Sequence, residues 1–446
     1  MNLSVVGSGR VGAVVAACFA QLGHHVVAVE IDPARRAELE RGRAPFTEPG
    51  LDSMLCSALE SGALSFTDDV ERAVRSSTVV FVCVGTPAGS DGSPSMEAVR
   101  GAARSIGASI RTPQVVVTKS TVPVGTGEWL KPEIEKSLEV PLVPGLVEVV
   151  SNPEFLREGS SVDDFLHPDR IVVGADGARA REVVLEVYEP LLAAERAIGR
   201  EIPVFVTELV TAEMAKYASN AFLATKISFA NEMARICDLV GADITEVTAV
   251  MGADSRIARD YLDAGLGWGG SCFGKDIVAL TTTARARGFS PRIVDAAVRV
   301  NDAQRDLVVD QLERHLGPLE ARRVGVLGLT FKPGTDDLRD SAALQVVAAL
   351  VERGAVVAAC DPTVSALPGY PAVRVCAGPR EVAAGADALV LATAWPEYLD
   401  LDLSDLRRLA AGTLVVDGRN ALDRGAAVAA GFTYVGIGRR ADRSPR

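Results

Sequence analysis

The stretch LSVVGSGRVG, residues 3–12, decides the fold of the first part of the chain. Its apolar start predicts a short strand, and the small residues that continue to Leu22 predict a helix. A second β-branched run at 25–29 completes a βαβ unit. Glycines spaced GxGxxG between strand and helix let a pyrophosphate approach the backbone at the helix N-terminus. The stretch therefore predicts a dinucleotide site at Gly7, Gly9, Arg10, Val11 and Gly12.

The second strand of this unit leads into an acidic residue, Glu30. A carboxylate here bonds the adenosine ribose hydroxyls and repels the extra phosphate of NADP, so the sequence favours NAD. Asp32 is close enough in sequence to share the role. Arg35 and Arg36 leave NADP as the alternative, because arginine suits a phosphate group.

The same strand and helix pattern recurs later in the chain. Runs at 79–84 and 115–118 are typical of parallel strands buried on both faces. Residues 207–240 contain few helix breakers and predict a long central helix, and VGVLGL at 324–329 begins a second α/β region. We expect an α/β fold with two doubly wound Rossmann-like domains joined by a long central helix and helical dimerisation segment. The expected domains are 1–203, 204–310 and 311–446, with a frayed tail at 441–446.

Composition excludes several classes of protein. The 446 residues carry 46 Lys and Arg against 58 Asp and Glu, a net charge of −12, which disfavours nucleic acid and anionic membranes as partners. Seven scattered cysteines without a CxxC pair argue against disulfides and against a metal site. The start of the chain has no signal-peptide pattern, and no apolar run reaches ~20 residues. We expect a cytoplasmic protein without a metal.

The segment GLGWGGSCFGKD, residues 265–276, is the sharpest local signal. Its glycines predict an irregular loop whose backbone amides bind a ligand, with Cys272 beside Lys275. A nearby cation lowers the pKa of a thiol and makes the thiolate available as a nucleophile. The alternative is an inert buried cysteine. We give that interpretation to the cysteines set among apolar residues, which are Cys18, Cys83, Cys237, Cys360 and Cys376.

Two further groups of polar residues suggest a site. Lys216 and Asn220 are four residues apart on the central helix, so they share a face on which they could stabilise an oxyanion. The second α/β region lacks the later two glycines after Gly328, so it should not hold a dinucleotide in the same way. Its cations, Lys332, Arg339 and Arg419, suit a phosphate or sugar hydroxyl, with ordinary solvated charge as the alternative.

Taken together, the motifs resemble those of the UDP-glucose dehydrogenase family, within the wider UDP-glucose/GDP-mannose dehydrogenase group. The similarity runs nearly end to end. Two places depart from the usual pattern: FGKD at 273–276 lacks proline or glutamine before the lysine, and DAG at 263–265 replaces a proline-glycine pair. The blocks that carry the resemblance are GSGRVG at 7–12, VGTP at 84–87, KSTVPVGT at 119–126, SNPEFLREG at 151–159, GWGGSCFGKD at 267–276, FKPGTDDLRDS at 331–341 and DGRN at 417–420.

The resemblance implies a four-electron oxidation of UDP-glucose to UDP-glucuronate that consumes two NAD. Cys272 would carry the sugar as a thiohemiacetal and then as a thioester. Lys216 and Asn220 would hold the developing oxyanion, and Asp276 would assist proton transfer. Thr121 and Glu154 would position the hydrolytic water.

The resemblance also implies a homodimer through the central helices and two sets of ligand contacts. The residues implied for NAD are Gly7, Gly9, Arg10, Val11, Gly12, Glu30, Thr86, Thr121, Glu158, Lys275 and Arg339. The residues implied for the UDP-sugar are Glu154, Phe155, Leu156, Lys216, Asn220, Arg256, Gly269, Cys272, Phe331, Lys332 and Arg419.

Alternatives remain open at this point. Within the same group, the substrate could instead be GDP-mannose or UDP-N-acetylmannosamine. A two-electron dehydrogenase of the 3-hydroxyacid or 6-phosphogluconate type shares the glycine-rich start, but needs neither the cysteine nor a third domain. A non-catalytic nucleotide-sugar sensor would keep the fold without the chemistry.

Overall fold

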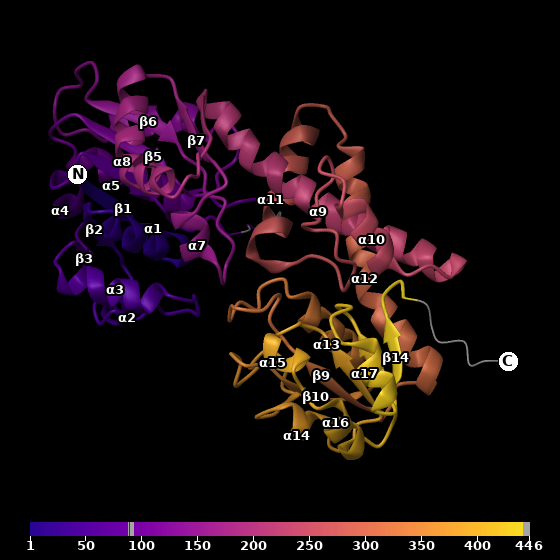
Figure 1. Ribbon diagram of the computed structural model, residues 1–446. Helices are drawn as coiled ribbons and strands as arrows, with labels where there is room; N and C mark the ends of the chain where they lie inside the picture. The colour runs from indigo at the N-terminus through magenta and orange to yellow at the C-terminus, as the bar shows by residue number, and fades with distance from the viewer. Residues whose placement is uncertain (88, 90–92, 440–446) are drawn as a thin grey trace. The chain divides into compact units, whose positions relative to one another are not determined.

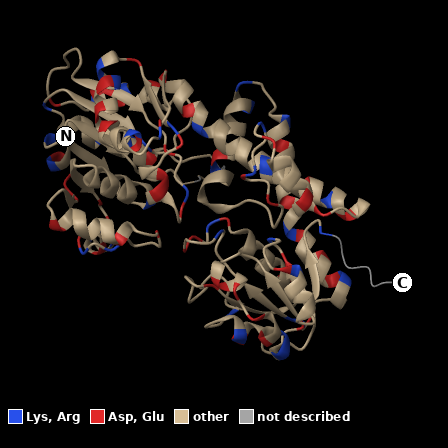
Figure 2. Ribbon diagram, viewed as in Figure 1, with Lys and Arg blue, Asp and Glu red and all other residues tan. Residues whose placement is uncertain are grey.

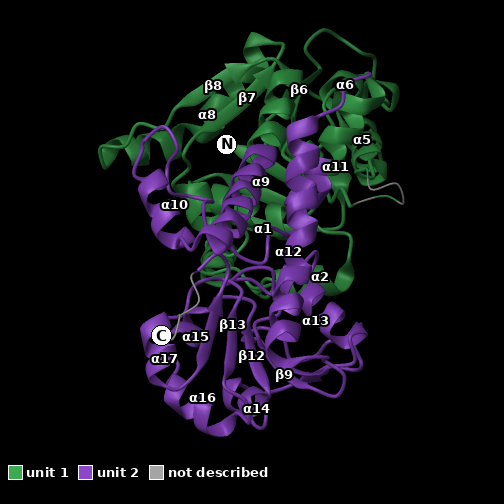
Figure 3. Ribbon diagram, turned by 90° about the vertical axis from the view of Figure 1, so that its right-hand side faces the viewer, with its two compact units in different colours: residues 1–219, 278–287 green, residues 220–277, 288–446 purple. Residues whose placement is uncertain are grey.

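The structure, a computed structural model, describes residues 1–87, 89 and 93–439, and its chain forms two compact units (Figures 1 and 3). Unit 1 comprises residues 1–219 and 278–287, and unit 2 comprises residues 220–277 and 288–446. One boundary between the units falls inside the long helix α9 (Leu209–Val240). The division into three domains expected from the sequence stays a prediction.

Unit 1 is built on an eight-stranded sheet with the order β3-β2-β1-β4-β5-β6-β7-β8. Neighbouring strands are parallel except for the pair β6 and β7. This order places the carboxyl ends of β1 and β4 side by side, at the point where the chain reverses its direction across the sheet. The strands are β1 (Asn2–Val6), β2 (His25–Val29), β3 (Leu64–Thr67), β4 (Val79–Val82), β5 (Gln114–Thr118), β6 (Val147–Ser151), β7 (Ile171–Ala175) and β8 (Val204–Thr207).

The helices of unit 1 bury apolar side chains against this sheet. Helix α1 is buried from Gly12 to Ala20, and the Phe19 ring lies 4.8 Å from Phe81 and 5.6 Å from Tyr188 between ring centroids. A helix buried nearly all round is expected where it packs under other elements. The helices are α1 (Arg10–Gln21), α2 (Pro33–Leu39), α3 (Leu51–Glu60), α4 (Val70–Arg75), α5 (Glu97–Ser109), α6 (Thr126–Lys136), α7 (Ser161–Leu166) and α8 (Ala178–Ala197).

Unit 2 contains a second parallel sheet, with the order β11-β10-β9-β12-β13-β14. Its strands are β9 (Arg323–Leu327), β10 (Val356–Cys360), β11 (Arg374–Val375), β12 (Ala388–Leu391), β13 (Leu414–Asp417) and β14 (Thr433–Gly436). Its remaining helices are α10 (Ile244–Gly252), α11 (Gly270–Ala286), α12 (Arg292–Leu316), α13 (Ala342–Glu352), α14 (Pro379–Ala383), α15 (Pro396–Leu399), α16 (Leu403–Leu409) and α17 (Arg424–Ala429), of which α11 ends in unit 1.

The two expected Rossmann-like sheets and the long helix at 207–240 are confirmed. The expectation of an irregular loop through residue 276 is wrong, because α11 already begins at Gly270. Past that residue the segment has one further glycine, Gly274, and otherwise residues that tolerate a helix. The irregular part is therefore only 265–269. The predicted frayed tail at 441–446 lies outside the described residues.

Charged residues of both signs are spread over both units (Figure 2). Within the described part of the chain, no helix is both long and apolar enough to cross a membrane.

Candidate functional site

The glycine turn after β1 combines close packing with open space. Gly7 has φ +94°, and a Cβ on Gly12 would lie 1.8 Å from the Gly7 carbonyl oxygen, so both positions require glycine. A Cβ on Gly9 would meet no described atom within 4 Å. Helix α1 begins directly afterwards without a side-chain cap. The open space and uncapped amides fit the pyrophosphate of a dinucleotide.

Glu30 follows β2 and is buried. Its carboxylate accepts a hydrogen bond from the Asp32 amide at 2.9 Å and pairs with Arg35 at 3.2 Å. Arg36 pairs with Asp68 at 2.6 Å. Both arginines that suggested NADP already contact carboxylates, which favours NAD. Asp32 caps α2 through the Arg35 amide.

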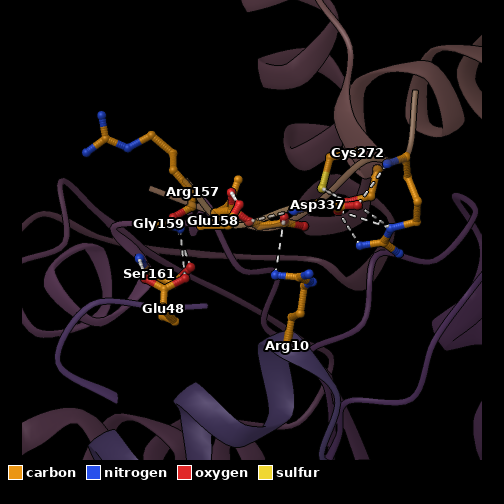
Figure 4. Close-up of polar contacts among 12 residues, drawn as sticks. Arg10, Glu48, Arg157, Glu158, Gly159, Ser161, Cys272 and Asp337 are labelled. Carbon is orange, nitrogen blue, oxygen red and sulfur yellow. Dashed lines mark hydrogen bonds and ion pairs between the residues drawn. The ribbon is translucent and has the colours of Figure 1, made fainter. Parts of the chain in front are cut away.

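Four residues predicted to contact the cofactor lie in pairs in unit 1, three of them on loops and Arg10 at the start of α1. Thr86 donates a hydrogen bond from its hydroxyl to the Thr121 carbonyl at 2.9 Å. Arg10 and Glu158 form an ion pair at 3.8 Å (Figure 4). These loops follow β4, β5 and β6, and α1 follows β1, so the contacts gather at the carboxyl ends of the parallel strands.

Glu48 supports the same loops and was not predicted from the sequence. Its carboxylate accepts hydrogen bonds from the amides of Gly159 at 2.8 Å and Ser161 at 2.7 Å, at the start of α7 (Figure 4). Glu48 precedes Pro49 and Gly50, a pattern that indicates only a turn. No local signal marks a carboxylate that reaches amides more than a hundred residues away.

Glu154 and Lys216 form a buried ion pair. Their charged atoms are 3.1 Å apart, and each side chain is 5% exposed. The second carboxylate oxygen of Glu154 accepts a hydrogen bond from the Leu156 amide at 2.6 Å, and the Lys216 ammonium lies 5.4 Å from the centre of the Phe155 ring. An ion pair held in such surroundings fixes the position of both groups.

A second buried lysine supports the segment that carries Glu154. Lys119 donates to the Asn152 side-chain oxygen and to the Tyr188 hydroxyl, both at 3.0 Å. The Asn152 amide group donates in turn to the Val172 carbonyl at 2.7 Å. Lys119 and Asn152 lie in two of the motif blocks but were given no role there, because each follows a strand and could belong to a plain turn. Tyr188 was not singled out, because it reads locally as part of a helix.

Cys272 lies in the first turn of α11 in unit 2 and is partly exposed, with its sulfur 3.7 Å from the Ser271 hydroxyl (Figure 4). The Asp276 carboxylate, one turn further along, accepts a hydrogen bond from the Asn220 amide at 2.6 Å and pairs with Lys275 at 2.6 Å. Two predicted residues, Asn220 and Lys275, thus contact the buried carboxylate of a third, Asp276.

The other cysteines of the sequence analysis behave as predicted. All five that we interpreted as inert are buried, and burial raises the pKa of Cys83 to about 12 and that of Cys360 to about 11. A thiol with such a pKa is not a nucleophile at neutral pH. Cys56, which we did not classify, is exposed.

Arg419 is partly buried in unit 2. Its guanidinium donates to the carbonyls of Ala392 at 2.7 Å, Gly267 at 3.4 Å and Phe331 at 3.5 Å. Burial lowers the pKa of Arg419 to about 10, and the negative charge of Asp417 partly opposes the shift. A guanidinium that donates to neutral carbonyls keeps its positive charge, which favours the binding of an anion.

The remaining predicted residues of unit 2 fall into two sets. Gly269 and Phe331 lie at the glycine-rich segment that precedes Cys272. A Cβ on Gly269 would lie 2.1 Å from the Asp340 carbonyl oxygen, and the Lys332 ammonium lies 5.9 Å from the Phe331 ring centre. Arg339 and Arg256 instead form two-pronged ion pairs with neighbouring acids, Asp337 and Asp254. Arg256 is 86% exposed, so it is not gathered with the others.

Family models match the chain in three consecutive segments. The NAD binding domain of the UDP-glucose/GDP-mannose dehydrogenase family matches residues 1–192, the central domain 210–303 and the UDP binding domain 325–424. The chain belongs to the UDP-glucose/GDP-mannose dehydrogenase family. The resemblance inferred from the motifs is therefore confirmed, as are NAD as the cofactor and an NAD-dependent dehydrogenase as the class of enzyme.

Individual members of the UDP-glucose/GDP-mannose dehydrogenase family are similar over nearly their whole length. The UDP-glucose 6-dehydrogenase of Rhizobium meliloti is 44% identical, covering 98% of this chain and 100% of that one. The structure of a UDP-glucose dehydrogenase from Pyrobaculum islandicum aligns with a TM-score of 0.88 and 41% identity, covering 98% and 97%. A UDP-D-ManNAc dehydrogenase from Pyrococcus horikoshii aligns with a TM-score of 0.84 and 28% identity, covering 98% and 99%.

Proposed function

We propose that the protein oxidises UDP-glucose to UDP-glucuronate in an NAD-dependent four-electron reaction. The observation that carries the proposal is a partly exposed thiol, Cys272, one helical turn from a buried carboxylate that Asn220 contacts. A thiol is needed only if an aldehyde must be retained between two oxidations. The choice of sugar is supported by 44% identity to a UDP-glucose 6-dehydrogenase and 41% to a UDP-glucose dehydrogenase, against 28% to a UDP-D-ManNAc dehydrogenase.

The first step requires a proton acceptor and stabilisation of an alkoxide on the sugar. NAD, when bound, accepts a hydride in each of the two oxidations. In our proposal, Lys216 supplies a positive charge to the developing oxyanion and Asn220 a hydrogen-bond donor. The two residues are one turn apart on α9, and Glu154 fixes the Lys216 side chain through their ion pair.

Cys272 then retains the aldehyde. Its sulfur forms a bond to the aldehyde carbon, and the carbonyl oxygen takes up a proton to give a thiohemiacetal. Asp276 assists that proton transfer, and the second oxidation converts the adduct to a thioester. Water, positioned by Thr121 and Glu154, attacks the thioester carbon. The carbon–sulfur bond breaks, the carboxylate is released, and the thiol is restored.

The UDP moiety is proposed to bind in unit 2, and NAD mainly in unit 1. Arg419 would neutralise the diphosphate or bond a sugar hydroxyl, together with Lys332, Phe331, Gly269 and the exposed Arg256. Phe155 and Leu156 would contact the sugar. For NAD, Glu30, Thr86, Thr121 and Glu158 would join the glycine turn, with Lys275 and Arg339. We also propose the domain division 1–203, 204–310 and 311–446, which the three matched segments support.

A homodimer through α9 is part of the proposal. Phe222, Phe229 and Ile236 are 65%, 44% and 46% exposed, and they recur every seventh residue on one face of the helix. An apolar stripe at this spacing is suited to a partner helix. Replacing Phe229 with Asp should convert the dimer to a monomer in sedimentation velocity, and an unchanged sedimentation coefficient would contradict this interface.

The decisive experiment counts NADH per sugar and tests the thiol. UDP-glucose should yield two NADH per molecule, and Cys272→Ala should lower turnover by about 1000-fold or more while UDP binding is retained. Cys56→Ala, at an exposed cysteine, is the matched control and should turn over normally. One NADH per sugar, or full activity in Cys272→Ala, would reject the covalent mechanism. Tight UDP-glucose binding without turnover in the wild type would instead favour a sensor.

A further inference from the structure

The irregular segment 265–269, which precedes Cys272, obtains its hydrogen bonds from side chains. It lies outside every helix and strand of the described structure. Buried backbone amides and carbonyls must nevertheless be paired, because an unpaired one costs about as much as a lost hydrogen bond. Three buried carboxamide side chains from α9 and α12 supply much of this pairing, and none of them was predicted from the sequence.

Asn301, on α12, brackets Trp268 of this segment. Its side-chain oxygen accepts from the Trp268 amide at 2.7 Å, and its side-chain amide donates to the Trp268 carbonyl at 3.1 Å. A carboxamide presents one acceptor and two donors, so it can replace a neighbouring peptide group. Gly267 makes this approach possible, since a Cβ there would lie 2.4 Å from the Asn301 oxygen and φ is +95°.

Asn231 and Gln304 divide the same task at Gly265. The Asn231 oxygen accepts from the Gly265 amide at 2.8 Å, and the Gln304 amide donates to the Gly265 carbonyl at 2.8 Å. Both side chains are 0% exposed. The other polar atoms of the two side chains, Nδ2 of Asn231 and Oε1 of Gln304, have no hydrogen-bond partner among the described residues.

Those two unpaired atoms argue that packing alone does not explain the residues. Ala297, Asn301, Gln304 and Val308 follow one another at helical spacing on the buried face of α12, where apolar side chains would be expected. A buried polar atom without a partner destabilises the fold. The carboxamides at these positions are explained by the hydrogen bonds that they make to the backbone of the segment 265–269.

The Trp268 ring is tied to the same two helices. Its indole nitrogen donates to the Ser228 hydroxyl on α9 at 3.0 Å, and that hydroxyl donates to the Ala297 carbonyl on α12 at 2.7 Å. Trp268 is therefore held through its backbone and its side chain, four residues before the thiol.

We propose that Asn301, with Asn231 and Gln304, forms a carboxamide bracket that positions Cys272 for attack on the aldehyde. Cys272 sits in the first turn of α11, so its location depends on where the backbone enters that helix at Gly270. A displacement of about 1 Å in a reacting group can cost ~100-fold in rate. Asn301 is thus a positioning residue that acts through Trp268. The inference rests on the proposed function.

Asn301→Asp tests the bracket, because aspartate keeps the acceptor but loses the donor and repels the Trp268 carbonyl. Amide hydrogen exchange should accelerate in peptides covering 265–269 but not in peptides covering α12. With UDP-glucose, kcat should fall by about 10- to 100-fold, while KM for NAD should change less than about twofold, because most of the proposed NAD contacts lie in unit 1. Gln311→Glu, which adds the same charge on α12 and can still accept from Arg314, is the control and should change neither quantity.

Gly267→Ala provides a second route to the same outcome, from the loop side of the contact. It should reproduce faster exchange and lower kcat even if Asn301→Asp fails to fold. Unchanged exchange in a folded Asn301→Asp protein, or faster exchange with unchanged kcat, would overturn the proposal. The exchange measurement needs no substrate. If the wild type showed no turnover with UDP-glucose, the proposed function would fail while the bracket could still be tested.

Discussion

The two parallel sheets of this protein share an arrangement but treat the turn after their first strand differently. Gly7 follows β1 and Gly328 follows β9, and both have φ +94°. In unit 1 the helix begins at Arg10, immediately after the turn, and the space beside Gly9 is open. In unit 2 the next helix begins only at Ala342, so the helix N-terminus is not at the turn.

The acidic residue after the second strand also differs in what it binds. Glu30, after β2, contacts Asp32 and Arg35 and leaves the glycine turn free. Asp361, after β10, accepts hydrogen bonds from the amides of Leu329 at 2.8 Å and Thr330 at 3.1 Å. The protein's own carboxylate thus occupies the amides that a phosphate could use. A shared strand order therefore does not give a shared binding site.

The largest effect should come from filling the open space in unit 1. Gly9→Ala should lower NAD affinity by at least about 100-fold, or ~2.7 kcal/mol, because the added Cβ would occupy space that the pyrophosphate needs. Stability should change by no more than about 1 kcal/mol, since the Gly9 φ of −70° suits alanine. Calorimetric titration with NAD measures the loss. Gly378→Ala, at the open N-cap glycine of α14, is the control and should bind NAD normally.

The next largest effect should come from the cation of unit 2. Arg419→Met should weaken UDP binding by about 30-fold, because one or two charge-assisted hydrogen bonds of ~1.5–3 kcal/mol are lost. NAD binding should be unaffected, which distinguishes the two regions. Titration of each variant with UDP and with NAD separates the outcomes. Equal loss of both ligands would indicate general damage to the fold instead.

Asp361→Asn should lower the free energy of unfolding by about 1.5 kcal/mol, because the carboxamide retains only one of two oxygens that accept hydrogen bonds. Chemical denaturation measures the change. Asp423→Asn at the N-cap of α17 should cost little, since both residues cap helices well. The Asp361→Asn protein should still bind one NAD per chain, because no helix starts at the turn after β9. A second bound NAD would show that Asp361 alone closes the site.

The smallest effect concerns Glu213, a carboxylate of unit 1 that resembles Asp361. It accepts hydrogen bonds from the amides of Gly125 at 2.6 Å and Gly127 at 2.8 Å, and burial raises the pKa of Glu213. A raised pKa means that the unfolded chain ionises first as pH rises. The stability that protonated Glu213 contributes to the wild type is therefore lost as pH rises through the folded pKa of Glu213. Glu213→Gln does not titrate and lacks that loss.

The stability advantage of the wild type over Glu213→Gln should accordingly be larger near about pH 4 than near about pH 8. Denaturation curves at both pH values measure this difference. Glu232→Gln, at an exposed acid of the same helix, should follow the wild type at both. An advantage that grows with pH would mean that the amide hydrogen bonds outweigh burial and lower the pKa.

Much of the fold could be predicted because it is written in local patterns. The strands expected at 25–29, 79–84 and 115–118, the glycine turn and the long helix α9 all follow from apolar periodicity and from residues that favour or break a helix. The start of α11 at Gly270 could not be predicted, because the dense glycines before it mask a helix that follows. Glycine content indicates freedom of the backbone without indicating where that freedom ends.

By itself, the sequence determined the elements, the open dinucleotide turn and the chemistry available at Cys272, Lys216 and Asp276. Only the tertiary structure decided which polar groups meet. It pairs Lys216 with Glu154 and places Asn301 against Trp268. It also brings the Asp361 carboxylate to the backbone amides of the turn after β9. The physical reason is that backbone preferences act between near neighbours in the chain, whereas buried polar groups must find partners wherever packing brings them.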